Sequence, residues 1–118
     1  VISRAITLRD QNSGNKNRSI LKTAVDFIDS HYMEEDISLN TVANVANVSA
    51  NHFSALFSQN MGQTFIEYLT SLRMNKAKEL LASRRFSIGE VSSMVGFSDS
   101  KYFSTCFKKQ FGTSPSKI

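Results

Sequence analysis

Apolar residues recur at intervals of three and four along most of the chain, with polar residues between them. Leu21, Ala24, Val25 and Ile28 follow this spacing, which is the pattern of an amphipathic helix with one buried face. This first helix is expected to end near the acidic turn at 34–36. No stretch alternates with the period of two that a half-buried strand requires. The pattern therefore predicts an all-α fold.

Capping residues divide the rest of the chain into five further helices. Two of the expected N-termini, at Thr64 and Ser87, are followed three residues later by Glu, the spacing of a capping box. Asn47 and the glycines at 62, 96 and 112 are residue types that end helices, because they adopt positive φ at little cost. The expected N-terminal caps are Ser38, Ser49, Thr64, Ser87 and, for the last helix, Ser98 or Asp99.

One phrase occurs twice in this pattern, as "HFSALF" at 52–57 and "YFSTCF" at 102–107. The preceding short helices also match at a constant offset, with Val42 opposite Val91 and Asn47 opposite Gly96. The matched Asn and Gly suit a sharp turn between two helices. The repeated unit is therefore predicted to be a helix-turn-helix.

A single long helix separates the two units. Its length of about 19 residues corresponds to roughly 28 Å, close to the roughly 34 Å between successive major-groove faces of a duplex. Helical-repeat scaffolds, the alternative, normally stack at least three adjacent repeats. The expected division is a linker or remnant of an upstream domain at 1–18, a first subdomain at 19–62, the linking helix at 63–84 and a second subdomain at 85–118.

Composition and charge narrow the function classes. The 118 residues are 41% hydrophobic and include nine Phe, enough to build one domain or two very small ones. The apolar runs are shorter than the roughly 18 residues of a membrane span. A single Cys, at Cys106, and the lack of a Cys/His cluster argue against disulfide or zinc scaffolds and suit a reducing cytoplasm. The net charge of +4 favours a polyanionic partner.

The basic residues are unevenly distributed. No Lys or Arg lies between Lys22 and Arg73, whereas the segment from Arg73 onward carries most of the positive charge. We therefore expect the second subdomain to present the basic surface. Arg73, Lys76 and Lys78 on the long helix could approach a DNA backbone or form ordinary helix ion pairs.

The second helix of each unit carries the candidate DNA-binding residues, on the face opposite its Phe stripe. Asn51 is suited to adenine or to local backbone bonding, and Lys101 is the best single candidate for direct contact. Ser54 and Ser104 suit phosphate, as does Lys108. The full candidate set is Ala50, Asn51, His52, Ser54, Ala55, Ser58, Ser100, Lys101, Ser104, Thr105 and Lys108.

Chemistry of other kinds is not indicated. His31 and His52 are 21 residues apart without a third ligand, and Cys106 shares the Phe stripe as a small apolar residue. The sequence contains no Gly-rich phosphate loop, no nucleophile with a His partner and no carboxylates clustered in a defined site. We expect no cofactor, no metal and no enzymatic activity.

The stretch "IGEVSSMVGFSDSKYFSTCFKKQFGTSPSKI" at 88–118 resembles the C-terminal DNA-binding domain of AraC/XylS-type bacterial transcription regulators, including the subgroup fused to response-regulator receivers. The resemblance implies two helix-turn-helix units bridged by a long helix, with an upstream sensor domain and RNA polymerase as partners in the intact regulator. Ala55 and Thr105 depart from the family, which often has Arg or Lys there.

The sequence predicts binding of double-stranded DNA for transcription regulation, with one recognition helix from each unit in adjacent major-groove segments. The alternative is a helical protein-binding module that does not bind DNA.

Overall fold

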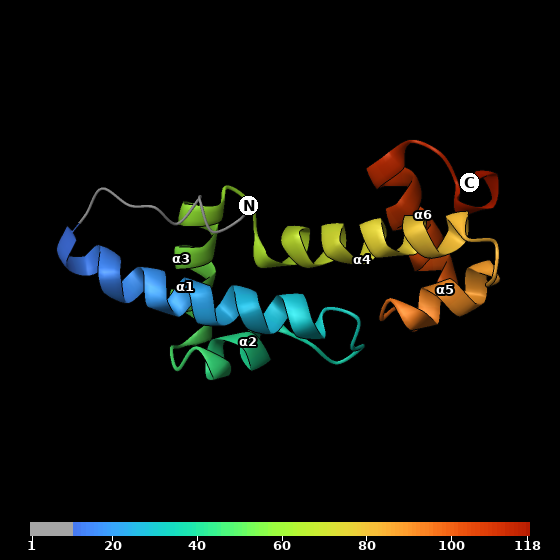
Figure 1. Ribbon diagram of the computed structural model, residues 1–118. Helices are drawn as coiled ribbons and strands as arrows, with labels where there is room; N and C mark the ends of the chain where they lie inside the picture. Colours follow the sequence, from blue (N-terminus) through green and yellow to red (C-terminus); the bar gives the residue numbers. More distant parts are fainter. Residues whose placement is uncertain (1–10) are drawn as a thin grey trace. The chain divides into compact units, whose positions relative to one another are not determined.

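The computed structural model in Figure 1 describes residues 11–118, and these are helical throughout apart from short connections. The prediction of an all-α fold is confirmed for the described residues. The elements are α1 (Gln11–His31), α2 (Leu39–Val45), α3 (Ala50–Met61), α4 (Phe65–Ala82), α5 (Ile88–Met94), α6 (Ser100–Phe111) and the short 3-10 helix η2 (Pro115–Lys117).

Helix α1 begins earlier than its apolar pattern indicates. The segment 1–18, expected to be a linker or a remnant of an upstream domain, is helical from Gln11 onward; residues 1–10 lie outside the described part. The first buried apolar residue of α1 is Ile20. Once packing of Ile20 and Leu21 has nucleated the helix, each further turn adds backbone hydrogen bonds at little cost, even in a polar sequence.

The expected caps are present where the structure describes them. Ser38 accepts from the Thr41 amide at 3.2 Å, and Ser49 accepts from the His52 amide at 3.1 Å. Both capping boxes close reciprocally, Thr64 with Glu67 and Ser87 with Glu90, with all four distances between 2.8 and 3.1 Å. The cap of α6 is Asp99, whose carboxylate accepts from the amides of Lys101 and Tyr102. The sequence therefore determines the helix starts locally.

Internal contacts divide the chain into two compact units. Of the described residues, the first contains 11–31 and 37–68, and the second contains 32–36 and 69–118. The long helix α4 thus contributes its first turn to one unit and the remainder to the other. The loop that follows α1 belongs to the second unit, a placement that its contacts with Arg73 explain.

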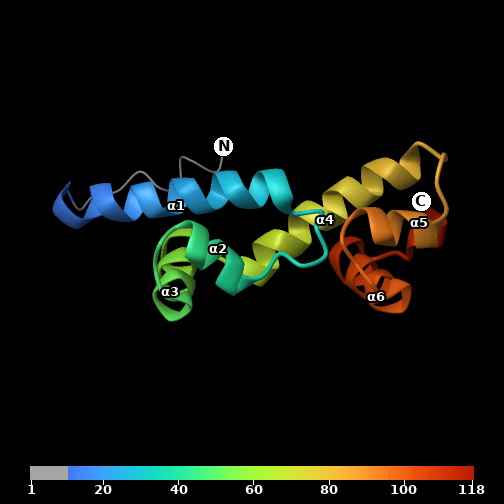
Figure 2. The same cartoon turned by 90° about the horizontal axis from the view of Figure 1, so that it is seen from below.

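In the first unit, α1 packs against both α2 and α3 (Figures 1 and 2). An aromatic cluster joins α3 to the start of α4: the ring of Phe57 lies 6.5 Å from that of Phe65 and 5.6 Å from that of Tyr68. The Tyr68 hydroxyl donates to the Asp29 carboxylate of α1 at 2.7 Å. This bond gives the buried phenol hydroxyl a hydrogen-bond partner, which it would otherwise lack.

The second unit has a core of its own. Met74, Ala77 and Leu81 of α4 pack with residues of α5, the following turn and α6. The other fully buried members are Val91, Val95, Phe103 and Phe107. Each unit therefore buries the inner face of a helix pair against a supporting helix, which leaves the outer face of that pair available to solvent.

Candidate nucleic-acid interface

The two helix pairs have the same construction. Each joins a helix of 7 residues to one of 12, α2 to α3 and α5 to α6. The Val48 amide donates to the Ala43 carbonyl at 3.0 Å, and at the matched position the Phe97 amide donates to the Ser92 carbonyl at 2.9 Å. The helix-turn-helix prediction is confirmed in both halves of the chain.

Positive φ angles produce both turns. Asn47 has φ 64° and Gly96 has φ 98°. The first value lies in the left-handed region that Asn tolerates, whereas the second lies further from it, where a side chain is more strained. The two turns are therefore equivalent in hydrogen bonding but not in the residues they accept.

The longer helix of each pair is anchored by its Phe stripe. Phe53 and Phe57 of α3 are completely buried, as are Phe103 and Phe107 of α6. Because residues three and four positions apart share a face, this anchoring turns the positions between them outward. The burial of the stripe thus orients the candidate residues.

The outward face of α3 is polar and uncharged. The structure places Asn51, His52, Ser54 and Ala55 in exposed positions, while Ala50 and Ser58 are half-buried. The side chain of Ser49 caps the helix without adding charge. This face can offer hydrogen bonds and small apolar contacts, but no ion pairs with phosphate.

The outward face of α6 carries positive charge. Ser100, Lys101, Thr105 and Lys108 are exposed and Ser104 is half-buried. The Thr105 hydroxyl donates to the Lys101 carbonyl at 3.1 Å, so this donor is already used within the helix. The structure therefore collects all eleven candidates on two helices, α3 and α6, with none of them buried.

The Asp99 cap distinguishes the N-terminus of α6 from that of α3. Its carboxylate sits where the partial positive charge of the helix would favour an anion. The amides of Lys101 and Tyr102 are thus bonded to a carboxylate of the protein itself.

Tyr102 is exposed on the same helix and was not among the sequence candidates. Its side chain is 60% exposed, and its ring lies 5.8 Å from that of Phe97. A hydrogen bond with Cys106 raises the pKa of the Tyr102 phenol. The repeat itself held the signal for this residue, since Tyr102 matches the candidate His52.

Arg73 does not behave as either sequence interpretation expected. Its Nε donates to the Tyr32 carbonyl and its Nη2 to the Glu34 carbonyl, both at 2.7 Å. Its Cζ lies 5.5 Å from the centroid of the Phe97 ring. Burial lowers the pKa of Arg73, and the charge of Glu35 opposes that shift. The guanidinium is thus engaged inside the second unit.

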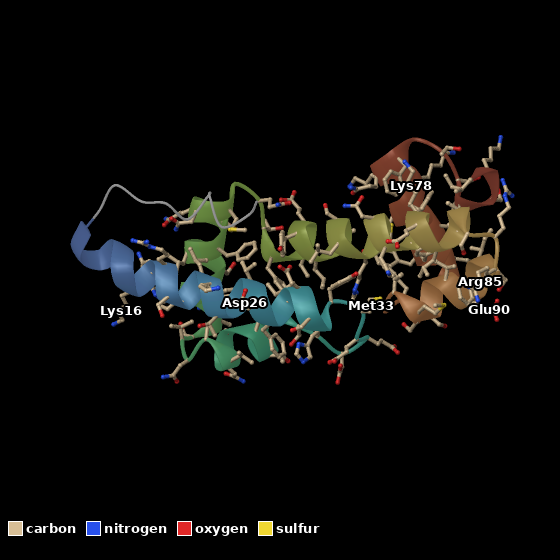
Figure 3. The ribbon with its side chains drawn as sticks, in the orientation of Figure 1. Lys16, Asp26, Met33, Lys78, Arg85 and Glu90 are labelled. Carbon is tan, nitrogen blue, oxygen red and sulfur yellow. The ribbon has the colours of Figure 1, made fainter. Side chains whose placement is uncertain are left out.

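The neighbouring lysines of α4 are also partnered. Lys76 lies 3.6 Å from the Glu79 carboxylate, which confirms the predicted helix ion pair. The ammonium of Lys78, labelled in Figure 3, lies 4.9 Å from the centroid of the Phe111 ring, where it covers the end of α6. Such exposed contacts contribute little to stability.

A helix-turn-helix domain model matches residues 42–118. The chain is 34% identical over 98 residues to the arabinose operon regulatory protein of Escherichia coli, covering 83% of this chain and 34% of that protein. The chain belongs to the AraC/XylS family of transcription regulators. The resemblance carried by residues 88–118 is therefore confirmed.

Solved structures of the family share the fold. The C-terminal domain of AraT, a response regulator from Geobacillus stearothermophilus, is 41% identical with a TM-score of 0.80, covering 83% of this chain and 81% of that one. The DNA-binding domain of AdpA, a global transcriptional factor solved with a target DNA, is 25% identical with a TM-score of 0.76, covering 84% of this chain and 87% of that one.

The chain spans only part of the curated family members. It covers 36%, 38% and 34% of the lengths of three of them. The properties of those whole proteins therefore include contributions from regions that this chain does not contain.

Other kinds of site find no support in the described residues. No group of three or more His, Cys, Asp or Glu among them is arranged to hold a metal ion. None of their helices is long and apolar enough to cross a membrane. Cys106 is half-buried against the second core, consistent with a packing role.

Proposed function

We propose that this chain binds double-stranded DNA as the DNA-binding domain of a bacterial transcription regulator. Helices α3 and α6 enter adjacent segments of the major groove, each through the face opposite its Phe stripe. The observation that carries this proposal is the duplicated helix-turn-helix, whose two longer helices both turn unburied polar faces outward. A major groove is wide enough to admit an α-helix presented in this way.

The candidate residues take roles that follow from their side chains. Asn51 hydrogen-bonds an adenine edge, whereas Ser54 and Ser104 bond phosphate oxygens. Lys101 makes a direct contact in the groove, and Lys108 adds phosphate affinity. His52, exposed in the first turn of α3, contacts a phosphate. The remaining candidates have small side chains that allow near approach of the helix to the duplex: Ala50, Ala55, Ser58, Ser100 and Thr105.

The two units contribute unequally to affinity. The exposed lysines of α6 release counterions when they neutralise phosphates, which makes binding by the second unit dependent on salt. The face of α3 carries no charged side chain, so the first unit contributes mainly polar contacts and amides at its helix N-terminus.

The remaining partners belong to the whole regulator. We propose that this chain is joined to an upstream sensor domain. The proposal is supported by the curated family members, of whose length this chain covers only about a third. Two of the solved relatives are C-terminal domains of response regulators, which favours a receiver for that role. RNA polymerase is the proposed partner at the promoter. The proposed location is the bacterial cytoplasm, with association to the nucleoid when the chain is bound to DNA.

Titration of the chain against duplex and single-stranded DNA tests the proposal. A random 20-bp duplex is expected to bind with an affinity that falls steeply as salt is raised, and single strands are expected to bind more weakly. Selection from a random duplex library then yields a preferred sequence. A chain that binds no duplex at low salt, or that selects no sequence, contradicts the proposal.

A further inference from the structure

Arg73 connects two segments of the second unit that are distant in sequence. Its two hydrogen bonds, each 2.7 Å long, end on the carbonyls of Tyr32 and Glu34 in the loop after α1. The same guanidinium lies over the ring of Phe97, with Cζ 5.5 Å from the ring centroid. One guanidinium therefore donates hydrogen bonds to a loop and makes a cation–π contact with the turn before α6.

The turn is shaped to receive this group. A Cβ added to Gly96 would lie 2.9 Å from the Arg73 Cζ, closer than real contacts of that kind occur. Gly96 also has φ 98°, so a side chain there would be strained as well as crowded. The glycine thus serves both the turn geometry and the close approach of the guanidinium.

Phe97 connects the Arg73 guanidinium to α6 through ring contacts. Its ring lies 5.8 Å from that of Tyr102 and 5.5 Å from that of Phe103. Tyr102 is exposed in the first turn of α6, next to Lys101, while Phe103 is the buried anchor of that helix. The start of the recognition helix therefore rests on a ring that Arg73 covers.

We propose that Arg73 is a positioning residue for DNA recognition by the second unit. It holds the Gly96–Phe97 turn so that α6 presents Lys101 and Tyr102 at the correct angle to the groove, and it makes no contact with DNA itself. This inference rests on the proposed function. Its physical basis is that Arg73 is half-buried and that its Nε and Nη2 already donate to the carbonyls of Tyr32 and Glu34 within the protein.

Two substitutions separate positioning from charge. Arg73→Gln removes both the charge and the guanidinium fork. Arg73→Lys keeps the charge but lacks the planar fork whose Nε and Nη2 reach the two carbonyls. Lys22→Gln is the matched control, since it removes one positive charge and an exposed ion pair from α1. Circular dichroism establishes that each variant is folded before it is compared with the wild type.

The DNA measurement compares the affinity for the duplex that the wild-type chain selects with the affinity for the same duplex scrambled in one half. One half is the part contacted by α3 and the other is the part contacted by α6. The halves are assigned by their response to Asn51→Ala in α3 and Thr105→Ala in α6. Both Arg73 variants are expected to lose about tenfold or more in discrimination at the α6 half, with the α3 half and the salt slope unchanged. Lys22→Gln leaves both halves as they are.

Two other results overturn the inference. If Arg73 contacts phosphate, Arg73→Gln lowers the salt slope by about 0.9 and Arg73→Lys restores it. If Arg73 serves stability alone, both halves lose discrimination together or neither does. Should Arg73→Gln fail to fold, Phe97→Leu removes the stacked ring while the two carbonyl bonds stay, and the same loss confined to the α6 half is expected.

A measurement without DNA separates this inference from the proposed function. The chain has three Tyr, and Tyr68 in the first unit is an internal reference for Tyr102. In proton NMR spectra of the free chain, Arg73→Lys is expected to shift the ring signals of Tyr102 while those of Tyr68 stay. A wild type that binds no duplex refutes the function alone, whereas an unmoved Tyr102 ring refutes the positioning role.

Discussion

The two helix-turn-helix units have the same skeleton but differ in their turns and surfaces. Helix lengths, turn hydrogen bonds and buried Phe pairs match from one to the other. The first turn is formed by Asn47, whereas in the second the φ of 98° at Gly96 and the nearby Arg73 guanidinium both disfavour a side chain. The same arrangement of helices therefore accommodates two different turn residues and two outward faces of different charge.

Exchanging the turn residues should produce the largest effect. Gly96→Asn is expected to destabilise the chain by about 3 kcal/mol, from backbone strain and from displacement of the Arg73 guanidinium. Asn47→Gly is expected to cost less than about 1 kcal/mol, because φ 64° suits both residues. Urea unfolding of the two variants measures the difference.

A double-mutant cycle sharpens this result. In an Arg73→Ala background, Gly96→Ala should lose the part of its cost that comes from crowding, leaving only backbone strain. Equal costs in both backgrounds would show that the guanidinium and the turn are independent.

The surface difference predicts the next largest effect. Replacing Lys101 and Lys108 together by Gln should lower the slope of log K against log[salt] by about 1.8, if each contacts one phosphate, and weaken binding about thirtyfold or more near 0.1 M salt. Replacing Asn51 and Ser54 by Ala should instead leave the slope and change base preference. Salt titrations on the selected duplex distinguish the pairs, and an unchanged slope in the lysine variant would falsify the division.

The matched core positions Ser92 and Ala43 predict a smaller effect on stability. The Ser92 hydroxyl is buried with no hydrogen-bond partner among the described residues. Ser92→Ala should therefore stabilise the chain by about 1 kcal/mol, whereas Ala43→Ser should destabilise it by a similar amount. Thermal unfolding measures both, and a loss of stability in Ser92→Ala would indicate an ordered water at the hydroxyl.

The bond between Tyr68 and Asp29 in the first unit predicts an effect of similar size, together with a pH dependence. Burial, followed by the hydrogen bond to Asp29 and its charge, raises the pKa of Tyr68. Its stabilising contribution is thus complete below the unfolded value of about 10 and is lost as the pH rises above it. Tyr68→Phe should cost about 1 kcal/mol at neutral pH and flatten this decline. Unfolding measured between pH 8 and 11 tests it, and an unchanged decline in Tyr68→Phe contradicts the assignment.

Local signals in the sequence accounted for much of the fold. Caps and capping boxes involve atoms within three residues of each other, so Ser49 and Ser87 could be recognised from their neighbours alone. The recurrence of Phe at helical spacing likewise oriented α3 and α6, and with them the candidate residues. The polar start of α1 escaped prediction because its helix extends from packing further along the chain.

The sequence by itself determined the helices, their duplication and the outward residues, since each depends on short-range spacing. Only the tertiary structure decided the contacts of Arg73, whose acceptors Tyr32 and Glu34 are 41 and 39 residues away. It also decided that the loop after α1 joins the second unit. Long-range hydrogen bonds and cation–π contacts depend on how the helices pack. The spacing of residues along one helix does not indicate which residues of another segment will contact it.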